Sequence, residues 1–197
     1  TRCQKTGEVT RWTATYLIAA DGAGSQTRRS AGIDMVGPST LAVMSNEYWR
    51  ADLSRLPIAR EAAGFIIVPD TPDLPRAAIL NTNGRDRWLT VTQIGLTKDD
   101  RERPWTDQEF IEIARGHVGI PDLDVTLLNR SIWRVSMQVA ETFRKGRVLL
   151  VGDCAHRFPP TGGFGLNSGV QDAHNLAWKL AFVLKGLADE KLLDSYS

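Results

Sequence analysis

Residues able to do chemistry gather in one segment late in the chain. The apolar run 147–151 (Arg-Val-Leu-Leu-Val) has the character of a buried strand, and Asp153 follows closely. A glycine-rich loop comes next, in which Gly163 and Gly165 lack a Cβ and let the backbone approach a flat ring. The free N–H groups at the start of the following helix can stabilise an anion. This segment therefore suits a large ligand with hydroxyl groups and partial negative charge.

A second polar turn lies much earlier in the chain. The apolar run 16–20 leads into residues 21–25 (Asp-Gly-Ala-Gly-Ser), and Arg28 follows. A competing interpretation is a dinucleotide fingerprint, Gly-Ala-Gly-x-x-Thr, with Glu47 as the distant acid. Thr27 occupies the place of the third glycine and no clear βαβ unit follows, so this alternative is the weaker one.

Both segments resemble motifs of one family. Residues 146–180 resemble the second FAD motif, Gly-Asp, of the class A FAD-dependent aromatic-ring monooxygenases, the family of p-hydroxybenzoate and phenol hydroxylases. Residues 20–28 resemble that family's Asp-Gly-x-x-Ser-x-x-Arg motif. The resemblance implies that these residues bind the cofactor: Asp21, Gly22, Arg28, Gly152, Asp153, Pro159, Gly163, Gly165, Leu166 and Asn167.

The resemblance also implies a division of labour. The carboxylate after the late strand binds the ribityl chain, Pro159 and the glycine loop lie against the isoalloxazine ring, and the helix N-terminus faces the flavin N1–O2 edge. NADH or NADPH reduces FAD, and O2 then supplies one oxygen atom to a small aromatic, phenol-like substrate. Because the flavin performs the oxygen chemistry, we predict no catalytic side chain and no metal site. His156 is accordingly expected to be structural.

Two alternatives remain open. One is a related FAD enzyme: an epoxidase, a halogenase or a dehydrogenase. The other is a non-catalytic ligand-binding module on the same scaffold. The family's first motif, GxGxxG, is not found in the sequence. We therefore expect the sequence to be an internal piece of such an enzyme that does not turn over alone.

The fold class expected is α/β. The resemblance implies a partial FAD-binding domain of the Rossmann-like GR2 type, formed by residues 1–36 and 140–197. A mixed β-sheet substrate domain, residues 37–139, is inserted between them. We predict that strands 16–20 and 148–151 lie in one sheet layer, because both end in cofactor motifs.

Local patterns predict the elements. Short β-prone runs occupy residues 41–53, 64–69, 76–81 and 88–94, and residues 124–139 are β-rich. A capping box that begins at Thr106 predicts a helix over 107–118. A second box at Ser168 and Gln171 predicts the start of a long helix that Gly186 ends. The predicted apolar stripe of that helix consists of Val170, Ala173, Ala177, Leu180, Ala181 and Leu184.

Composition excludes some partners. The 24 basic and 23 acidic side chains give a net charge of +1, which offers no electrostatic case for nucleic acid or an anionic membrane. No apolar run approaches the roughly 20 residues that span a bilayer. The two cysteines are far apart, so a reduced, cytoplasmic protein is expected.

The remaining conspicuous side chains have ordinary structural interpretations. Cys154 is expected to pack beside a tight turn. His117 and His174 are expected at the surface of their helices. The tryptophans Trp49, Trp88 and Trp133 fall in the sheet region, where core packing is favoured over a place in the substrate-pocket wall.

Overall fold

The computed structural model describes residues 1–70 and 74–196 in two compact units. Unit 1 comprises Thr1–Pro38 and Met137–Ser197, and unit 2 comprises Ser39–Ser136. The chain thus leaves unit 1 after Pro38 and returns to it at Met137. These boundaries lie a few residues away from the expected divisions at 36/37 and 139/140. The Met137 N–H donates to the Pro38 carbonyl and Gln138 Nε2 donates to the Gly37 carbonyl, so these residues belong to unit 1.

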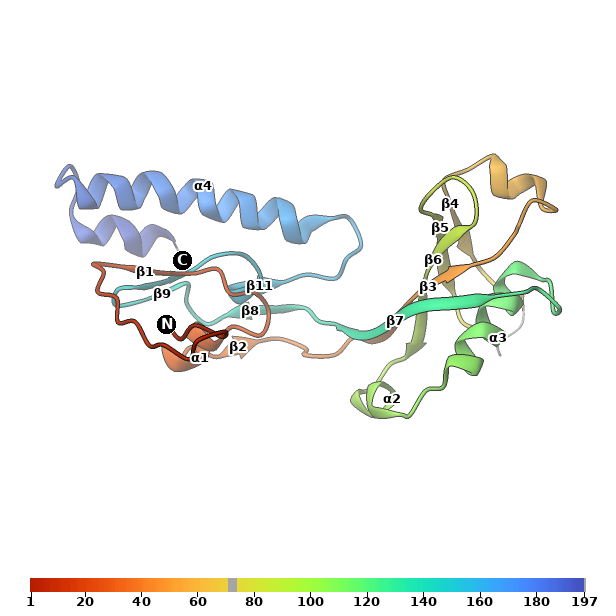
Figure 1. Ribbon diagram of the computed structural model, residues 1–197. Coiled ribbons are helices and arrows are strands. Elements are labelled where there is room, and N and C mark those ends of the chain that lie inside the picture. Colours follow the sequence, from red (N-terminus) through yellow and green to blue (C-terminus); the bar gives the residue numbers. More distant parts are fainter. Residues whose placement is uncertain (71–73, 197) are drawn as a thin grey trace. The chain divides into compact units, whose positions relative to one another are not determined.

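The first sheet of unit 1 joins strands from the two ends of the chain. β1 (Leu17–Ala19) pairs in parallel with β10 (Val148–Leu150), with Leu17 opposite Val148 and Ala19 opposite Leu150. β9 (Arg144–Lys145) pairs antiparallel with the other edge of β10. The predicted meeting of the two motif-bearing strands in one layer is confirmed (Figure 1).

A second small sheet of unit 1 places β8 (Gln138–Ala140) between β2 (Met35–Val36) and β11 (His156–Arg157). Two short helical segments accompany the sheets: α1 (Gln26–Ser30) follows β1, and the 3-10 turn η2 (Gly152–Cys154) follows β10. Ala19, Leu150, Cys154 and Ala155 share one buried cluster. The turns after β1 and β10 are therefore packed on a common core.

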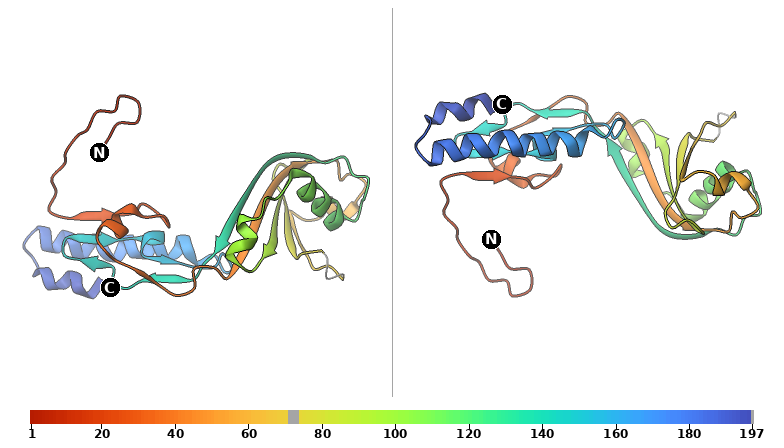
Figure 2. Two further views of the ribbon diagram at one scale, coloured as in Figure 1. Left: turned by 90° about the horizontal axis from the view of Figure 1, so that it is seen from below. Right: turned by 90° about the horizontal axis from the view of Figure 1, so that it is seen from above.

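Helix α4 (Phe164–Leu184) and the 3-10 segment η3 (Glu190–Tyr196) run beside each other and pack on β10 through Leu149, Leu176 and Leu193 (Figure 2). The N-cap of α4 is Gly163, so the predicted capping box at Ser168 and Gln171 is wrong. Since positive-φ glycines end the preceding loop, the helix starts after Gly163 rather than at Ser168 and has no side-chain cap. Gly186, with φ 68°, ends it in a Schellman arrangement.

The predicted apolar stripe of α4 is mostly exposed in this chain. The buried positions are Leu176 and Lys179, and Leu180 and Val183 join them at the same core. Val170, Ala173, Ala177 and Leu184 are exposed. Lys179 tolerates burial because its Nζ donates to the Ser195 carbonyl at 2.8 Å. The helix has apolar residues on both sides, so its pattern alone does not select the packed face.

Unit 2 is built on one antiparallel sheet in the order β4-β5-β6-β3-β7. The five strands are β3 (Ala42–Arg50), β4 (Gly64–Ile67), β5 (Ala77–Asn81), β6 (Arg87–Gly95) and β7 (Thr126–Val135). Each predicted β-prone run overlaps one of them. All its pairings are antiparallel, so the predicted mixed sheet is wrong in this respect, because the strands follow one another without the crossover helices that parallel pairing needs.

Helix α3 (Asp107–Val118) covers one face of this sheet and agrees with the predicted range and capping box. Trp49 and Trp88 stack beneath it with ring centroids 6.0 Å apart, so their predicted core packing is confirmed. α2 (Lys98–Glu102) and the 3-10 turn η1 (Pro57–Arg60) were not predicted; both are short, and the capping box of α2 uses Thr97 with Asp100. His117 is buried, because its Nε2 pairs with the Pro75 carbonyl at 2.7 Å, and its predicted surface position is wrong.

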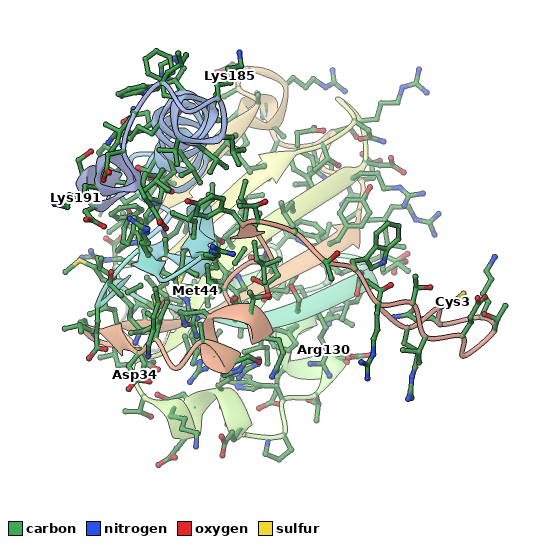
Figure 3. All side chains as sticks on the ribbon, turned by 90° about the vertical axis from the view of Figure 1, so that its left-hand side faces the viewer. Cys3, Asp34, Met44, Arg130, Lys185 and Lys191 are labelled. Carbon is green, nitrogen blue, oxygen red and sulfur yellow. The ribbon has the colours of Figure 1, made fainter. Side chains whose placement is uncertain are left out.

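The N-terminal segment of unit 1 stands apart from its sheets. One antiparallel bridge joins Arg2 to Val9 in this segment, and Cys3 lies on an exposed arm (Figure 3). Among the described residues, no helix has both the length and the apolar character needed to cross a membrane.

Candidate functional site

The candidate site starts from the parallel pair β1 and β10. Parallel strands that lie side by side end at the same edge of a sheet, so the turns that follow them are neighbours. Asp21 lies in the turn after β1, and Asp153 lies in the turn after β10. The pairing of Ala19 with Leu150 thus brings two sequence motifs to one edge.

The turn after β10 presents Asp153. Gly152 has φ 67°, a left-handed conformation that favours glycine, and it starts the 3-10 turn η2. Asp153 is exposed, and within residues 1–70 and 74–196 its carboxylate makes no hydrogen bond or ion pair. An ionised carboxylate that only accepts hydrogen bonds is then available to a ligand hydroxyl.

Cys154 anchors this turn from below. The side chain is fully buried, and its Sγ lies 2.7 Å from the Ala19 carbonyl oxygen. Burial raises the pKa of the Cys154 thiol, so the side chain stays a neutral donor. Its predicted packing role is confirmed, and it ties the turn after β10 to the end of β1.

The turn after β1 uses its carboxylate internally. The Asp21 carboxylate accepts hydrogen bonds from the Ser25 hydroxyl and, at 3.0 Å, from the Thr27 N–H. Partial desolvation raises the pKa of Asp21, but the hydrogen bonds from Ser25 and Thr27 outweigh it and lower that pKa to about 2. Ser25 in turn caps α1 by accepting from the Arg28 N–H at 2.9 Å.

Arginines connect the two turns. Arg28 is 5% exposed, and its Nη1 donates to the Cys154 carbonyl at 3.3 Å. Arg157 donates to the Ala23 carbonyl and, at 2.8 Å, to Gln138 Oε1. The residues of the two motifs therefore form one bonded assembly, in which Asp21 and Arg28 shape the edge and Asp153 faces outward.

The glycine loop and the start of α4 form the next part of the site. Gly163 has φ 66°, and α4 begins after it without a side-chain cap, which leaves N–H groups of the first turn free. A Cβ added at Gly163 or Gly165 would meet nothing within 4 Å. Leu166 is 80% exposed, Pro159 is half-buried, and Asn167 Nδ2 donates to the Gly163 carbonyl at 2.8 Å.

His156 and Asp172 lie behind the turn. His156 is buried, in agreement with the expected structural position, and His174 is exposed on its helix, as expected. The sequence patterns predict no role for Asp172, which accepts from His156 Nε2 at 2.5 Å. One sequence feature could have indicated a role for Asp172. It lies about one helical turn after Gly169, a small residue that lets α4 approach the backbone of Gly152.

The comparisons with known proteins decide the family. Residues 1–197 match the family model described as FAD binding domain. The chain belongs to the FAD binding domain family. The predicted resemblance to class A FAD-dependent aromatic-ring monooxygenases is thereby confirmed.

Relatives in this family carry hydroxylase and monooxygenase names. A putative polyketide hydroxylase of Streptomyces coelicolor is 40% identical over 99% of the chain and 31% of its own length. Tetracenomycin A2 monooxygenase-dioxygenase of Streptomyces glaucescens is 42% identical over 98% of the chain and 35% of its own length. Phenol 2-monooxygenase of a Pseudomonas species is 36% identical over 98% of the chain and 30% of its own length. The chain spans about a third of the length of these relatives.

Solved structures of family members agree with this assignment. A ternary complex of aklavinone-11 hydroxylase with FAD and aklavinone matches 92% of the chain with a TM-score of 0.77 and 35% identity. The flavin-dependent monooxygenase PieE, in complex with FAD and substrate, matches 92% of the chain with a TM-score of 0.73 and 38% identity. The chain covers 33% and 31% of these two structures.

The residues of unit 1 fit one end of FAD. The ribityl chain carries hydroxyl donors, and Asp153 offers a carboxylate that has no partner among residues 1–70 and 74–196. The flavin ring is flat, and the open backbone at Gly163 and Gly165 leaves room for close approach. The ring edge gathers negative charge on reduction, and the uncapped start of α4 offers N–H donors.

Proposed function

We propose that unit 1 binds the ribityl chain and isoalloxazine ring of FAD. The observation that carries this proposal is the carboxylate of Asp153, which has no partner among the described residues and follows Gly152, the residue that packs on Gly169 near the uncapped start of α4. The ribityl hydroxyls of FAD can donate hydrogen bonds to the Asp153 carboxylate. Negative charge at the edge of the flavin ring is complementary to the positive N-terminal end of α4. Gly152, Pro159, Leu166 and Asn167 complete the surface against the ring.

The predicted residues of the first turn have a different place in this proposal. Both oxygens of Asp21 and Nη1 of Arg28 make hydrogen bonds within the protein. In this proposal Asp21, Gly22 and Arg28 stabilise the turn after β1, at the part of the sheet edge that faces the pyrophosphate of FAD. Any contact of theirs with FAD or with a pyridine nucleotide is additional to that structural work.

The whole protein is proposed to be an FAD-dependent monooxygenase that hydroxylates an aromatic, phenol-like substrate. Support comes from relatives named phenol 2-monooxygenase and polyketide hydroxylase. When bound, FAD takes up electrons from NADH or NADPH and reacts with O2. The chain's residues bind and orient: Asp153 holds the ribityl chain, and the N–H groups of α4 stabilise negative charge at the ring.

Unit 2 is proposed to hold the substrate. One face of its sheet is covered by α3, and alternation along the strands places Met44, Asn46 and Trp133 on the other face. The Trp133 indole N–H donates to Asn46 Oδ1 at 2.9 Å. An ordered indole beside an amide offers an aromatic ring both stacking and hydrogen bonding. Trp133 is only partly buried, so the full core packing predicted for it is not found, in contrast to the buried Trp49 and Trp88.

The test uses the protein encoded by the complete gene. We expect purified protein to contain FAD and to oxidise NADH or NADPH faster when a phenolic substrate is present, with one oxygen atom added to the product. Asp153→Ala should weaken FAD binding by roughly 1.5–3 kcal/mol, about ten- to a hundredfold. The melting temperature of the apoprotein should not change, because the carboxylate has no partner in the part of the chain that the structure describes. Asp34→Ala, at another exposed aspartate of unit 1, serves as the control.

Different failures distinguish the alternatives. Full FAD binding by Asp153→Ala overturns the proposed site. Bound FAD with chloride- or bromide-dependent products, or with dehydrogenation, assigns a related FAD enzyme. Absence of flavin and of NAD(P)H oxidation from the complete protein assigns a ligand-binding module.

A further inference from the structure

A single carboxylate oxygen fixes the turn that carries Asp153. Asp172 Oδ2 accepts a hydrogen bond from the Gly152 N–H at 2.9 Å and a second from His156 Nε2 at 2.5 Å. The side chains of His156 and Asp172 are 5% and 15% exposed. A buried carboxylate oxygen with two donors is a strong and directional anchor. The Asp172 carboxylate thereby holds the backbone of Gly152, the residue immediately before Asp153.

The backbone around this anchor is closely packed. Gly152 adopts the left-handed conformation, and a Cβ added to Gly169 on α4 would lie 3.4 Å from its Cα. The turn after β10 and the first turns of α4 therefore touch directly through two glycines. The hydrogen bond from the Gly152 N–H to Asp172 locks this contact, since Asp172 lies on α4 itself.

The surroundings of His156 define its role as a donor. Its ring lies between Phe143 and Phe158, at centroid distances of 5.8 and 5.0 Å. Its Nδ1 is buried and has no hydrogen-bond partner in the described part of the chain. A proton on Nδ1 would be left without an acceptor, so the tautomer with the proton on Nε2 fits the site. His156 then donates to Asp172 and restrains its carboxylate.

We propose that His156 and Asp172 form a positioning pair that holds the Gly152–Asp153 turn against the start of α4 and so determines the affinity for FAD. The inference rests on the proposed function, because it needs Asp153 and the N-terminus of α4 to face the same cofactor. Neither residue touches FAD in this account. Both act through Gly152, which sets the place of the Asp153 carboxylate relative to the helix N–H groups.

The test compares conservative and truncating variants in the protein from the complete gene. Asp172→Asn keeps an acceptor oxygen for Gly152, and the amide of His156→Gln can replace the Nε2 donor. Both should bind FAD nearly as the parent does. Asp172→Ala and His156→Ala should each raise the dissociation constant for FAD by about tenfold. The double alanine variant should lose little more than either single one, since the two residues act as a unit.

Two readouts separate positioning from general stability. FAD affinity is measured by flavin fluorescence well below the melting temperature of each apoprotein. The reduction potential of bound FAD is measured at saturating cofactor, and His156→Ala should shift it to a more negative value, because a displaced α4 terminus stabilises reduced flavin less. His156→Gln should restore it. Asp34→Ala is the matched control.

The outcomes are decisive. Unchanged affinity and potential in both alanine variants would overturn the pair, as would equal losses in His156→Gln and His156→Ala. If Asp172→Ala does not fold, the comparison of His156→Gln with His156→Ala decides alone. Loss of FAD by Asp153→Ala with none by the pair rejects this inference and keeps the proposed function. Retention of FAD by Asp153→Ala rejects the proposed function first.

Discussion

The two turns at the edge of the parallel pair use the same residue type in opposite ways. Both carboxylate oxygens of Asp21, after β1, accept hydrogen bonds within the protein, one from the Ser25 hydroxyl and one from the Thr27 N–H. Asp153, after β10, is exposed and has no partner among the described residues. Neighbouring positions at one sheet edge thus carry a structural aspartate and an available one.

The difference shows that the turn after β1 supports the turn after β10. Asp21 and Ser25 order the start of α1, and α1 places Arg28 under the turn after β10, where it donates to the Cys154 carbonyl. The carboxylate of Asp153 stays free because other groups hold its backbone. A motif residue can therefore be required for cofactor binding without facing the cofactor.

The largest expected effect comes from cutting this link. Arg28→Ala should lower the free energy of unfolding by about 3 kcal/mol, since it removes a buried charged donor from the Cys154 carbonyl and leaves a cavity. Urea unfolding of the apoprotein measures it. Arg29→Ala, which alters the exposed neighbour on α1, should change stability by less than about 0.5 kcal/mol. Equal effects of the two variants would contradict the idea that the first turn supports the second.

The fold could be predicted wherever local patterns decide. The Thr106 capping box gave the exact range of α3, and the apolar runs located the strands. The pairing of β1 with β10 followed from the family resemblance, because nothing local links residues so far apart. The packed face of α4 was missed since apolar residues occur all round the helix, and the buried Lys179 depends on a distant carbonyl of η3.

The candidate site was predicted only in part, for a similar reason. Residue types and spacing indicate Asp153 and the glycine loop. They do not show that Asp21 is already bonded, that Arg28 reaches Cys154 or that Asp172 holds Gly152. Each of these is a contact between segments distant in sequence or a choice among several possible acceptors, and only the packed structure fixes it.

A third carboxylate, in unit 2, sharpens the comparison. Glu47 is 1% exposed, its Oε2 accepts from Thr92 Oγ1 at 3.2 Å, and its Oε1 has no partner within the described residues. Burial raises the pKa of Glu47 to about 7, the reverse of Asp21. A carboxyl with a raised folded-state pKa stabilises the protein at low pH, and this contribution is lost as the pH rises through about 7.

The second-largest expected effect is the pH dependence of stability that the raised pKa of Glu47 causes. Between pH 5.5 and 8 the free energy of unfolding should fall by about 2 kcal/mol through ionisation of Glu47. Glu47→Gln should remove most of this slope and should be more stable than the parent at pH 8. Urea unfolding at both pH values measures the difference, and the exposed Glu61→Gln is the control. An unchanged slope in Glu47→Gln would place the titrating group elsewhere.

The smallest effect tests the two aspartates directly. The pKa of Asp21 is lowered to about 2, so its carboxylate adds stability above its unfolded-state pKa, and this is lost as the pH falls from about 4 through 2. Because the side chain is exposed, solvent screening reduces the contribution to about 1 kcal/mol. Asp21→Asn should therefore be less stable than the parent by that amount at pH 7 and nearly equal to it near pH 2.

Asp153→Asn in the apoprotein provides the matched comparison, since the Asp153 carboxylate has no hydrogen-bond donor among the described residues. Its unfolding free energy at pH 7 should match that of the parent, while its affinity for FAD falls. Thermal melts of both variants from pH 7 to pH 2, with FAD titrations at pH 7, measure the two properties separately. If Asp153→Asn lost stability in the same acid window as Asp21→Asn, both turns would be structural. The distinction between a bonded and an available aspartate would then fail.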